Sequence, residues 1–179
     1  MSLSQISSIC SLEQFIQKLN IYSQKDASYY DRLIQTIDIS PESIASYCRW
    51  DSQSYTRNLV CQTDIYQLLV LCWQAGQASP VHDHQGQDCW MYIVEGTIQE
   101  TLYHPTNNLD KSCILQETDR IIHKRGDTSR LENSTLAWHS IQALSQRVIT
   151  LHLYSQPINK CHIYDIKTGQ VSERKLNYS

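Results

Sequence analysis

From residue 55 to residue 176 the chain is a succession of short runs rich in Val, Ile, Leu, Thr and Tyr. Turn-type clusters such as GQASP, HPTNN and RGDTS separate these runs. Many short strands at this spacing predict an all-β sandwich or a small barrel. The runs do not alternate with helical segments, which argues against a doubly wound parallel sheet. The predicted strands are 55–60, 65–73, 90–96, 97–103, 111–116, 120–124, 136–144, 147–155, 161–166 and 170–176.

Residues 1–50 have a different pattern, with apolar side chains at three- and four-residue spacings. Ser11 is placed to cap a helix that runs through Leu19, and a second helix is predicted over residues 31–39. Ser40 followed by Pro41 is typical of an N-cap and a first helical position, and predicts a short third helix through residue 47. We therefore expect a mainly β chain: a helical N-terminal layer (1–50) and a β-barrel (51–179), in one domain of 179 residues.

The composition excludes several classes of partner. The net charge is −3 and no basic run occurs, so neither nucleic acid nor an anionic membrane surface is expected to bind. No stretch approaches the ~18 apolar residues of a membrane span, and the N-terminus lacks the pattern of a signal peptide. The seven cysteines are scattered and form no CxxC pair, which argues against a disulfide framework and fits a reducing compartment. We expect a cytoplasmic monomer.

Two histidines, His82 and His84, enclose a single residue in the stretch HDHQGQDCW. On a strand, residues two apart point to the same face, so both imidazoles would converge on one point. So short a pattern is also typical of two surface histidines near a turn, but the long β runs on both sides favour a transition-metal site. A third ligand would come from a separate strand. His139 is the first choice and His152 the second.

The stretch from Gly76 to Gly96 matches the first cupin motif, in which an HxH pair precedes a position that is often glutamate. That position is Cys89 here. A degraded second motif begins at Gly126, and His139 stands at its histidine.

The cysteine at this position, together with three further stretches, resembles the cysteine dioxygenase family of thiol dioxygenases. The stretches are YTRNLV at 55–60, LCW at 71–73 and LHLYS at 151–155. The resemblance covers residues 55–165 in consistent order and implies a cupin-type, jelly-roll-like β-barrel. One departure is visible: animal members have Ser-Pro-Pro with a cis peptide bond where this chain has Ser155-Gln156-Pro157, which puts the local backbone in question.

The resemblance also implies a metal and a pocket. A mononuclear non-haem Fe(II) would be bound by three histidines: His82, His84 and His139. The α-carboxylate of the substrate would pair with Arg57. The other residues of the substrate pocket would be Tyr55, Trp73 and Cys161.

Three further residues would lie beside the iron. The family joins Cys89 and Tyr154 by a thioether bond, and His152 would hydrogen-bond the hydroxyl of Tyr154. Without the resemblance, Cys89 and Tyr154 are equally well interpreted as packed core residues, and Arg57 as a solvated arginine. His104, His123 and His162 are interpreted as surface or packed side chains without a role.

The implied reaction agrees with the chemistry of the ligand set. Three neutral imidazoles leave Fe(II) its full charge, whereas a two-His-one-carboxylate site offsets one unit, so an anionic thiolate is a favourable substrate ligand. Both atoms of O2 would pass to sulfur and give a sulfinate, a step of cysteine catabolism toward sulfinate and taurine. Arg57 offers the carboxylate a planar two-point partner. L-cysteine and O2 are therefore the expected substrates.

Three alternatives stay open. The first is dioxygenation of another small thiol, such as 3-mercaptopropionate or cysteamine, although Arg57 disfavours cysteamine, which has no carboxylate. The second is a non-catalytic metal-binding cupin that acts as a sensor. The third is a zinc or manganese isomerase or hydrolase, which a carboxylate at position 89 would have supported.

Overall fold

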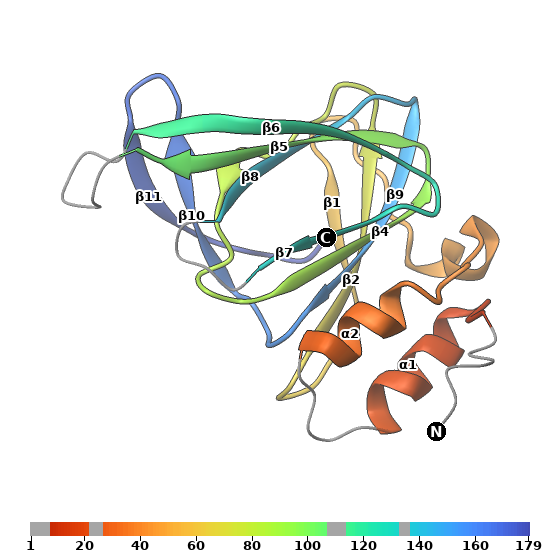
Figure 1. The fold of residues 1–179 in the computed structure, drawn as a ribbon. Coiled ribbons are helices and arrows are strands. Elements are labelled where there is room, and N and C mark those ends of the chain that lie inside the picture. The colour runs from red at the N-terminus through yellow and green to blue at the C-terminus, as the bar shows by residue number, and fades with distance from the viewer. Residues whose placement is uncertain (1–7, 22–26, 107–113, 133–136) are drawn as a thin grey trace.

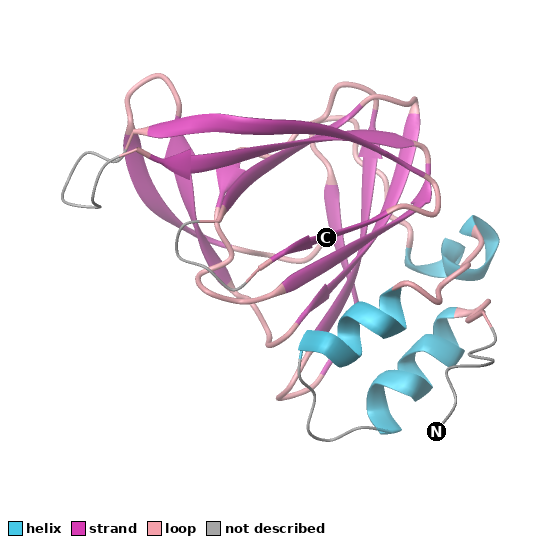
Figure 2. Ribbon diagram, in the orientation of Figure 1, coloured by secondary structure: helices cyan, strands magenta, loops and turns pink. Residues whose placement is uncertain are grey.

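The computed structural model describes residues 8–21, 27–106, 114–132 and 137–179. Two antiparallel sheets form a barrel, and helices lie against one side of it (Figures 1 and 2). The predicted fold class, a mainly β barrel with an N-terminal helical layer, is confirmed. The helices are α1 (Leu12–Ile21), α2 (Ala27–Ile34) and the 3-10 helix η1 (Pro41–Tyr47).

The first sheet has five strands in the order β1-β2-β9-β4-β7, and the second has six in the order β11-β10-β3-β8-β5-β6. The strands of the first sheet are β1 (Thr56–Gln62), β2 (Gln67–Gln74), β4 (Cys89–Glu95), β7 (Thr128–Leu131) and β9 (Arg147–Tyr154). Those of the second are β3 (Val81–His82), β5 (Thr97–Pro105), β6 (Leu115–Lys124), β8 (Trp138–Ala143), β10 (Lys160–Asp165) and β11 (Gln170–Lys175). Several strands that are neighbours in a sheet, such as β2 and β9, are far apart in the sequence, so the chain passes repeatedly from one sheet to the other.

The central strands β2, β4 and β9 are buried almost throughout because both of their faces are covered. Successive side chains of a strand point to opposite sides. Leu68, Val70 and Cys72 of β2 pack on the side of the helices, in one apolar cluster with Phe15 of α1. Leu69, Leu71 and Trp73 of the same strand pack on the inner side, in a second cluster. The barrel interior therefore begins directly beneath an apolar layer that excludes water.

Polar contacts tie the helical layer to the barrel. Nε1 of Trp90 in β4 donates to Asp31 of α2 at 2.6 Å, and the guanidinium of Arg130 in β7 donates to the same carboxylate at 3.0 Å. Arg130 also pairs with Asp88 at 3.0 Å, one residue before β4.

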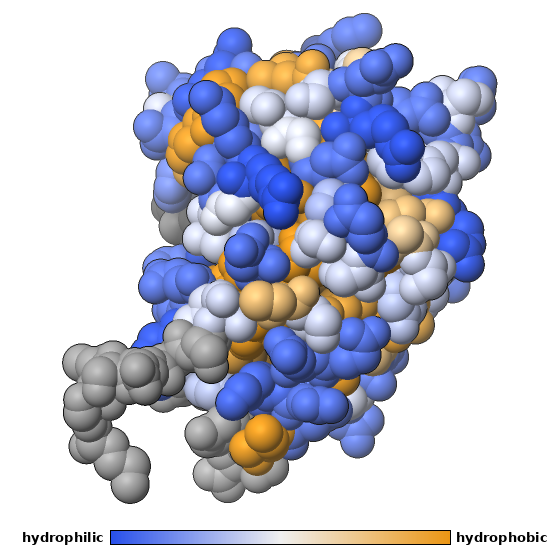
Figure 3. Space-filling model, turned by 90° about the vertical axis from the view of Figure 1, so that its right-hand side faces the viewer, coloured by the Kyte–Doolittle hydropathy of each residue, from blue (hydrophilic) through white to orange (hydrophobic). Residues whose placement is uncertain are grey.

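Figure 3 shows the side of the molecule that carries this layer as mostly hydrophilic, with apolar side chains in small separate patches.

The first helix is confirmed, and the third is confirmed in its extent. Ser11 caps α1, since its Oγ accepts the backbone N–H of Gln14 at 3.2 Å. The third begins at Pro41 as predicted, but it is a 3-10 helix and the Ser40 side chain does not cap it. The second helix, predicted over residues 31–39, is wrong in its bounds, because α2 begins at Ala27 and ends at Ile34.

The predicted bounds of the second helix are wrong because its apolar residues are buried in two different kinds of structure, a helix and a β-bridge. Leu33 and Ile34 are buried as helical residues, whereas Ile37 is buried in an isolated parallel bridge to Ile9. The helical stripe continues backward through the buried Tyr30, which the aliphatic pattern did not include.

The predicted strands are found, with three differences. The runs predicted at 111–116 and 120–124 belong to one long strand, β6, as far as they are described, and Cys113 lies outside the described residues. Strand β7 lies partly in the cluster RGDTS that was interpreted as a turn. Strand β3 has two residues, too few for a pattern to indicate.

Gly96 joins β4 to β5 and provides a test of the barrel's packing. It has φ +84°, and a Cβ there would collide with the carbonyl oxygen of Arg147 and lie 2.8 Å from Cγ2 of Val148. Gly76 has a similar φ of +81° but open space around it. We predict that Gly76→Ala lowers the free energy of unfolding by about 1–2 kcal/mol, the cost of left-handed backbone. Gly96→Ala should lower it by about 1–3 kcal/mol more, because overpacking adds to the strain.

Urea denaturation of both variants beside the unmodified chain would measure this difference. Equal losses for the two glycines would contradict the close approach of Gly96 to β9.

Candidate active site

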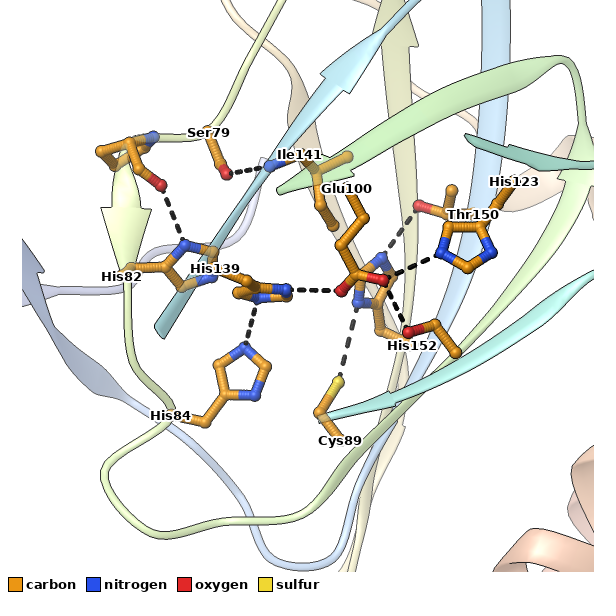
Figure 4. Close-up of polar contacts among 12 residues, drawn as sticks. Ser79, His82, His84, Cys89, Glu100, His123, His139, Ile141, Thr150 and His152 are labelled. Atoms are coloured by element: carbon orange, nitrogen blue, oxygen red, sulfur yellow. Dashed lines mark hydrogen bonds and ion pairs between the residues drawn. The ribbon is translucent and has the colours of Figure 1, made fainter. Parts of the chain in front are cut away.

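Three histidines gather between the two sheets, as the sequence predicted. The ring nitrogens that His82, His84 and His139 can offer to a metal ion all lie within 4.8 Å of one another, and Nε2 of His84 is 3.2 Å from Nε2 of His139 (Figure 4). Two nitrogen ligands about 2.1 Å from a shared ion such as zinc lie roughly 3 Å apart. The spacing and the chemistry of these donors therefore fit a transition-metal ion.

Strand pairing explains the position of His82 but not that of His84. His82 lies directly opposite His139 across β3 and β8, so their side chains share a face. Strand β3 ends at His82, so the expectation that His84 shares its strand is wrong, although the two imidazoles do converge. The intervening Asp83 is held against β10: its carboxylate accepts the backbone N–H of His162 at 2.7 Å and contacts the ring Nδ1 of that residue at 2.8 Å.

Burial keeps the imidazoles of His82 and His84 neutral and available as ligands. Desolvation, followed by the nearby His139, lowers the pKa of His82 to about 3 and that of His84 well below its usual value. Nδ1 of His82 lies 3.0 Å from the carbonyl of Pro80. A neutral ring that donates there has its lone pair on Nε2, the nitrogen that faces the other two histidines.

A cavity of about 310 Å³ adjoins the three histidines. Its lining includes all four residues predicted to form the substrate pocket: Tyr55, Arg57, Trp73 and Cys161. The rings of Tyr55 and Trp73 stack with centroids 4.1 Å apart. Burial raises the pKa of the Cys161 thiol to about 11, so this cysteine is a neutral part of the wall.

Arg57 has a buried donor without an acceptor. The residue is 8% exposed, and among the described residues its Nη1 has no hydrogen-bond partner. An unpaired charged donor in a buried position is costly, so a ligand acceptor in the cavity would relieve it. The backbone of Arg57 is held by Ser179, which also lines the cavity, through hydrogen bonds of 2.9 and 3.2 Å.

Cys89 and Tyr154 are directly opposite each other on β4 and β9. Side chains in such a pair have Cβ atoms about 4.5–5.5 Å apart. Both are buried, and the Tyr154 ring lies against His84 with centroids 5.3 Å apart. Desolvation raises the pKa of both groups, so the thiol and the phenol are neutral here. Sequence alone could not show that these two residues meet.

The predicted contact between His152 and the Tyr154 hydroxyl is not formed. Nε2 of His152 lies 2.9 Å from Oγ1 of Thr150, and Nδ1 lies 3.8 Å from Sγ of Cys89. Both ring nitrogens therefore have other partners, and the ring only stacks on Tyr154 at a centroid distance of 6.4 Å. Thr150 in turn accepts from Nε1 of Trp73 at 3.0 Å, which links the pocket wall to this histidine.

The backbone around Ser155 and Gln156, which the sequence left in question, is trans, as are all peptide bonds between described residues. Ser155 is held by a 2.9 Å hydrogen bond from its backbone N–H to the carbonyl of Asp88.

Sequence reasoning missed a buried carboxylate behind the histidines. Glu100 of β5 lies 2.8 Å from Nδ1 of His139 and 2.9 Å from Nε2 of His123, and accepts a 2.6 Å hydrogen bond from Ser129. Burial alone would raise the pKa of Glu100, but the hydrogen bonds of His123, His139 and Ser129 outweigh it and lower the pKa. The signal was present in TIQETLY, where alternation puts Glu100 on the same face as the buried Ile98. His123 and His162, to which no role was given, each contact a buried carboxylate.

No helix among the described residues is long and apolar enough to cross a membrane.

Solved structures with a similar fold are distant in sequence. TT1209 from Thermus thermophilus superposes with a TM-score of 0.51 at 17% identity, over 63% of this chain and 93% of that one. KdgF from Halomonas sp. gives 0.50 at 18% identity, over 63% and 91%. A cupin superfamily protein from Desulfitobacterium hafniense gives 0.49 at 16% identity, over 64% and 88%. At these identities the likeness concerns the fold alone, and the predicted cupin-type barrel is confirmed.

Curated relatives are closer. The chain is 28% identical to cysteine dioxygenase type 1 of Homo sapiens over 149 residues, which are 82% of this chain and 73% of the human one. It is 31% identical to the Bos taurus enzyme over 140 residues, 76% and 68% of the two chains. The Danio rerio enzyme is 26% identical over 173 residues, 93% and 85%.

The family model for cysteine dioxygenase type I matches residues 1–167, a range that includes the three histidines, Arg57 and the Cys89–Tyr154 pair. The chain therefore belongs to the cysteine dioxygenase type I family.

Proposed function

We propose that this protein is an Fe(II)-dependent dioxygenase that converts L-cysteine and O2 to cysteine sulfinate. The observation that carries the proposal is the content of one cavity: three histidines whose ligand atoms lie within 4.8 Å of one another, and a buried arginine whose Nη1 has no partner among the described residues. A ligand with a carboxylate at one end and a soft metal-binding group at the other would satisfy both. L-cysteine has that shape.

The metal would be held by His82, His84 and His139. Neutral imidazoles suit iron, zinc and copper alike, so the choice of Fe(II) rests on the family and on the reaction. When bound, Fe(II) would supply the redox chemistry with O2 that no side chain of the cavity offers.

Arg57 would orient the substrate. Its planar guanidinium can donate two parallel hydrogen bonds to a carboxylate, and the hydrogen bonds to Ser179 hold its backbone. The stacked rings of Tyr55 and Trp73 form a rigid wall beside it. Fixing the carboxylate in this way would leave the thiol and the amine directed toward the histidines.

Cys89 and Tyr154 would form one edge of the site, where they exclude water and present a thiol and a phenol. Their place as direct partners on β4 and β9 supports a thioether bond between them. That bond would hold the phenol against His84 and keep the Cys89 sulfur from ligating the metal. The hydrogen bond between His152 and Thr150, and that between Thr150 and Trp73, would fix the surrounding wall.

Two alternatives are less well supported. A non-catalytic sensor cupin would not need both the unpaired Nη1 donor of Arg57 and the buried Cys89–Tyr154 pair. Dioxygenation of 3-mercaptopropionate uses the same carboxylate and thiol, so it differs from the main proposal only in relative rates. We also propose that the protein works in the cytoplasm, since the six cysteines in the described part of the chain are all free and a reducing compartment keeps them so. A monomer is part of the same proposal.

The proposal predicts stoichiometric oxygen uptake. Purified protein loaded anaerobically with Fe(II) should bind one iron per chain, consume O2 on addition of L-cysteine, and form one cysteine sulfinate per O2. His139→Ala should lose most of its iron binding and its uptake. An oxygen electrode, iron determination and mass spectrometry of the product measure the three quantities. The proposal would be refuted, and a sensor favoured, if the iron-loaded protein consumed no O2 with L-cysteine, 3-mercaptopropionate or cysteamine.

Arg57→Lys tests the carboxylate contact. The variant keeps the charge and loses the two-point geometry, so we predict that kcat/KM for L-cysteine falls about 10–100-fold, the value of a charge-assisted hydrogen bond of about 1.5–3 kcal/mol. Cysteamine has no carboxylate and is the matched control, because its kcat/KM should change little. An equal loss for both thiols would show that Arg57 does not recognise the carboxylate.

The Cys89–Tyr154 bond predicts a mass change. Its formation removes one hydrogen from the thiol and one from the phenol ring, a two-electron oxidation with O2 as oxidant. Protein exposed to Fe(II), L-cysteine and O2 should therefore lose two hydrogens in intact mass and yield a linked peptide after digestion. Cys89→Ser and Tyr154→Phe should show neither. Unchanged mass in the active, unmodified chain would contradict the crosslink.

A further inference from the structure

Glu100, to which the proposed chemistry gives no role, lies at the centre of a buried polar cluster. The residue is 1% exposed. One carboxylate oxygen, Oε1, contacts Nδ1 of His139 at 2.8 Å. The other, Oε2, contacts Nε2 of His123 at 2.9 Å and the hydroxyl of Ser129 at 2.6 Å. Figure 4 shows Glu100 between the two histidine rings, with His82 and His84 on the far side of His139.

The strand register makes this arrangement rigid. His139 of β8 pairs with Leu102 of β5, two residues from Glu100, so both point to the same face of the sheet. His123 of β6 pairs with Ile98, two residues to the other side. Ser129 reaches the carboxylate from β7 in the opposite sheet. Residues of three strands, β6, β7 and β8, therefore contact the carboxylate that β5 carries.

The carboxylate is an acceptor for every group around it. A neutral imidazole carries its proton on one nitrogen. If that proton is on Nδ1 of His139, directed at Glu100, the lone pair of Nε2 is left facing His84 and the cavity. The other two histidines of the site lack such a partner: His82 contacts a neutral carbonyl, and Nδ1 of His84 has no partner among the described residues.

We propose that Glu100 is the positioning residue of the metal site. It fixes the tautomer and orientation of His139 through their hydrogen bond. It also places a negative charge next to this ligand, on the side away from the metal, and the three histidines themselves carry no such charge. This inference rests on the metal site of the proposed function. A carboxylate that accepts from a ligand imidazole makes that imidazole a stronger donor, which favours the higher oxidation state of a bound metal. His123 and Ser129 hold Oε2, so that Oε1 stays directed at His139.

The test compares Glu100→Gln with two matched controls, with Co(II) as the metal probe. Chelator competition should show Co(II) bound about 10–100-fold more weakly by Glu100→Gln than by the unmodified chain. Ser129→Ala removes one donor from Oε2 but leaves the contact to His139 in place, so it should weaken Co(II) binding only several-fold. Glu117→Gln changes an exposed glutamate of β6 and should lose nothing.

A second readout separates positioning from a merely structural role. In the iron-loaded protein, the midpoint potential of the Fe(III)/Fe(II) couple should be higher in Glu100→Gln, because the neutral amide stabilises Fe(III) less. A residue that only supports the barrel would lower the melting temperature of the metal-free protein and leave both the affinity and the potential unchanged. That result would overturn the proposal.

Two outcomes keep this inference distinct from the proposed function. If the unmodified chain binds neither Co(II) nor Fe(II), the metal site itself fails. If it binds them and Glu100→Gln binds equally well, only the role of Glu100 fails. Should Glu100→Gln not fold, His123→Phe keeps the carboxylate and removes one donor from Oε2. It should weaken Co(II) binding several-fold, and an affinity unchanged from the unmodified chain would refute the proposal.

Discussion

The site depends on a sheet that is covered on both faces. Strands β2, β4 and β9 carry apolar residues outward against the helices and a mixture of apolar and polar residues inward. Because the outer layer excludes water, every polar group on the inner face must find a partner inside the barrel. The paired groups, such as Thr150 with His152, form its fixed walls. Nη1 of Arg57 is one of the buried side-chain atoms without a partner in the described structure, and because Arg57 lines the cavity, a ligand there could pair with it.

The same exclusion of water sets the charges of the interior. Burial lowers the pKa of His82, His84 and His152, so these imidazoles are neutral, while Cys89 and Tyr154 keep their protons because burial raises the pKa of each. Glu100 is the exception, because its hydrogen bonds outweigh its burial and lower its pKa. The interior thus offers neutral nitrogen ligands toward the cavity, an anion behind one of them, and the guanidinium of Arg57 at the cavity wall. This distribution suits a cationic metal and an anionic substrate.

Sequence patterns predicted the elements whose burial follows a simple period. The long strands β2, β4 and β9 were found because each is rich in aliphatic, aromatic and β-branched residues, and α1 because its stripe and its Ser11 cap agree. The pattern misled where one apolar residue could be buried in two ways, as Ile37 is in a bridge instead of a helix. It was silent at β3, where two residues pair between β8 and β10.

The sequence by itself determined the barrel, the helical layer, the family and the three histidines, because period, turn chemistry and motif spacing are local properties of the chain. Tertiary structure decided which distant residues meet. Cys89 faces Tyr154 because of the β4–β9 register, and Glu100 meets His139 and His123 because β5 lies between β8 and β6. His152 contacts Thr150, two residues away on its own strand, and Cys89 across the β4–β9 pair, instead of the Tyr154 hydroxyl. Strand order and register are set by the packing of the whole barrel, and no short stretch of sequence contains them.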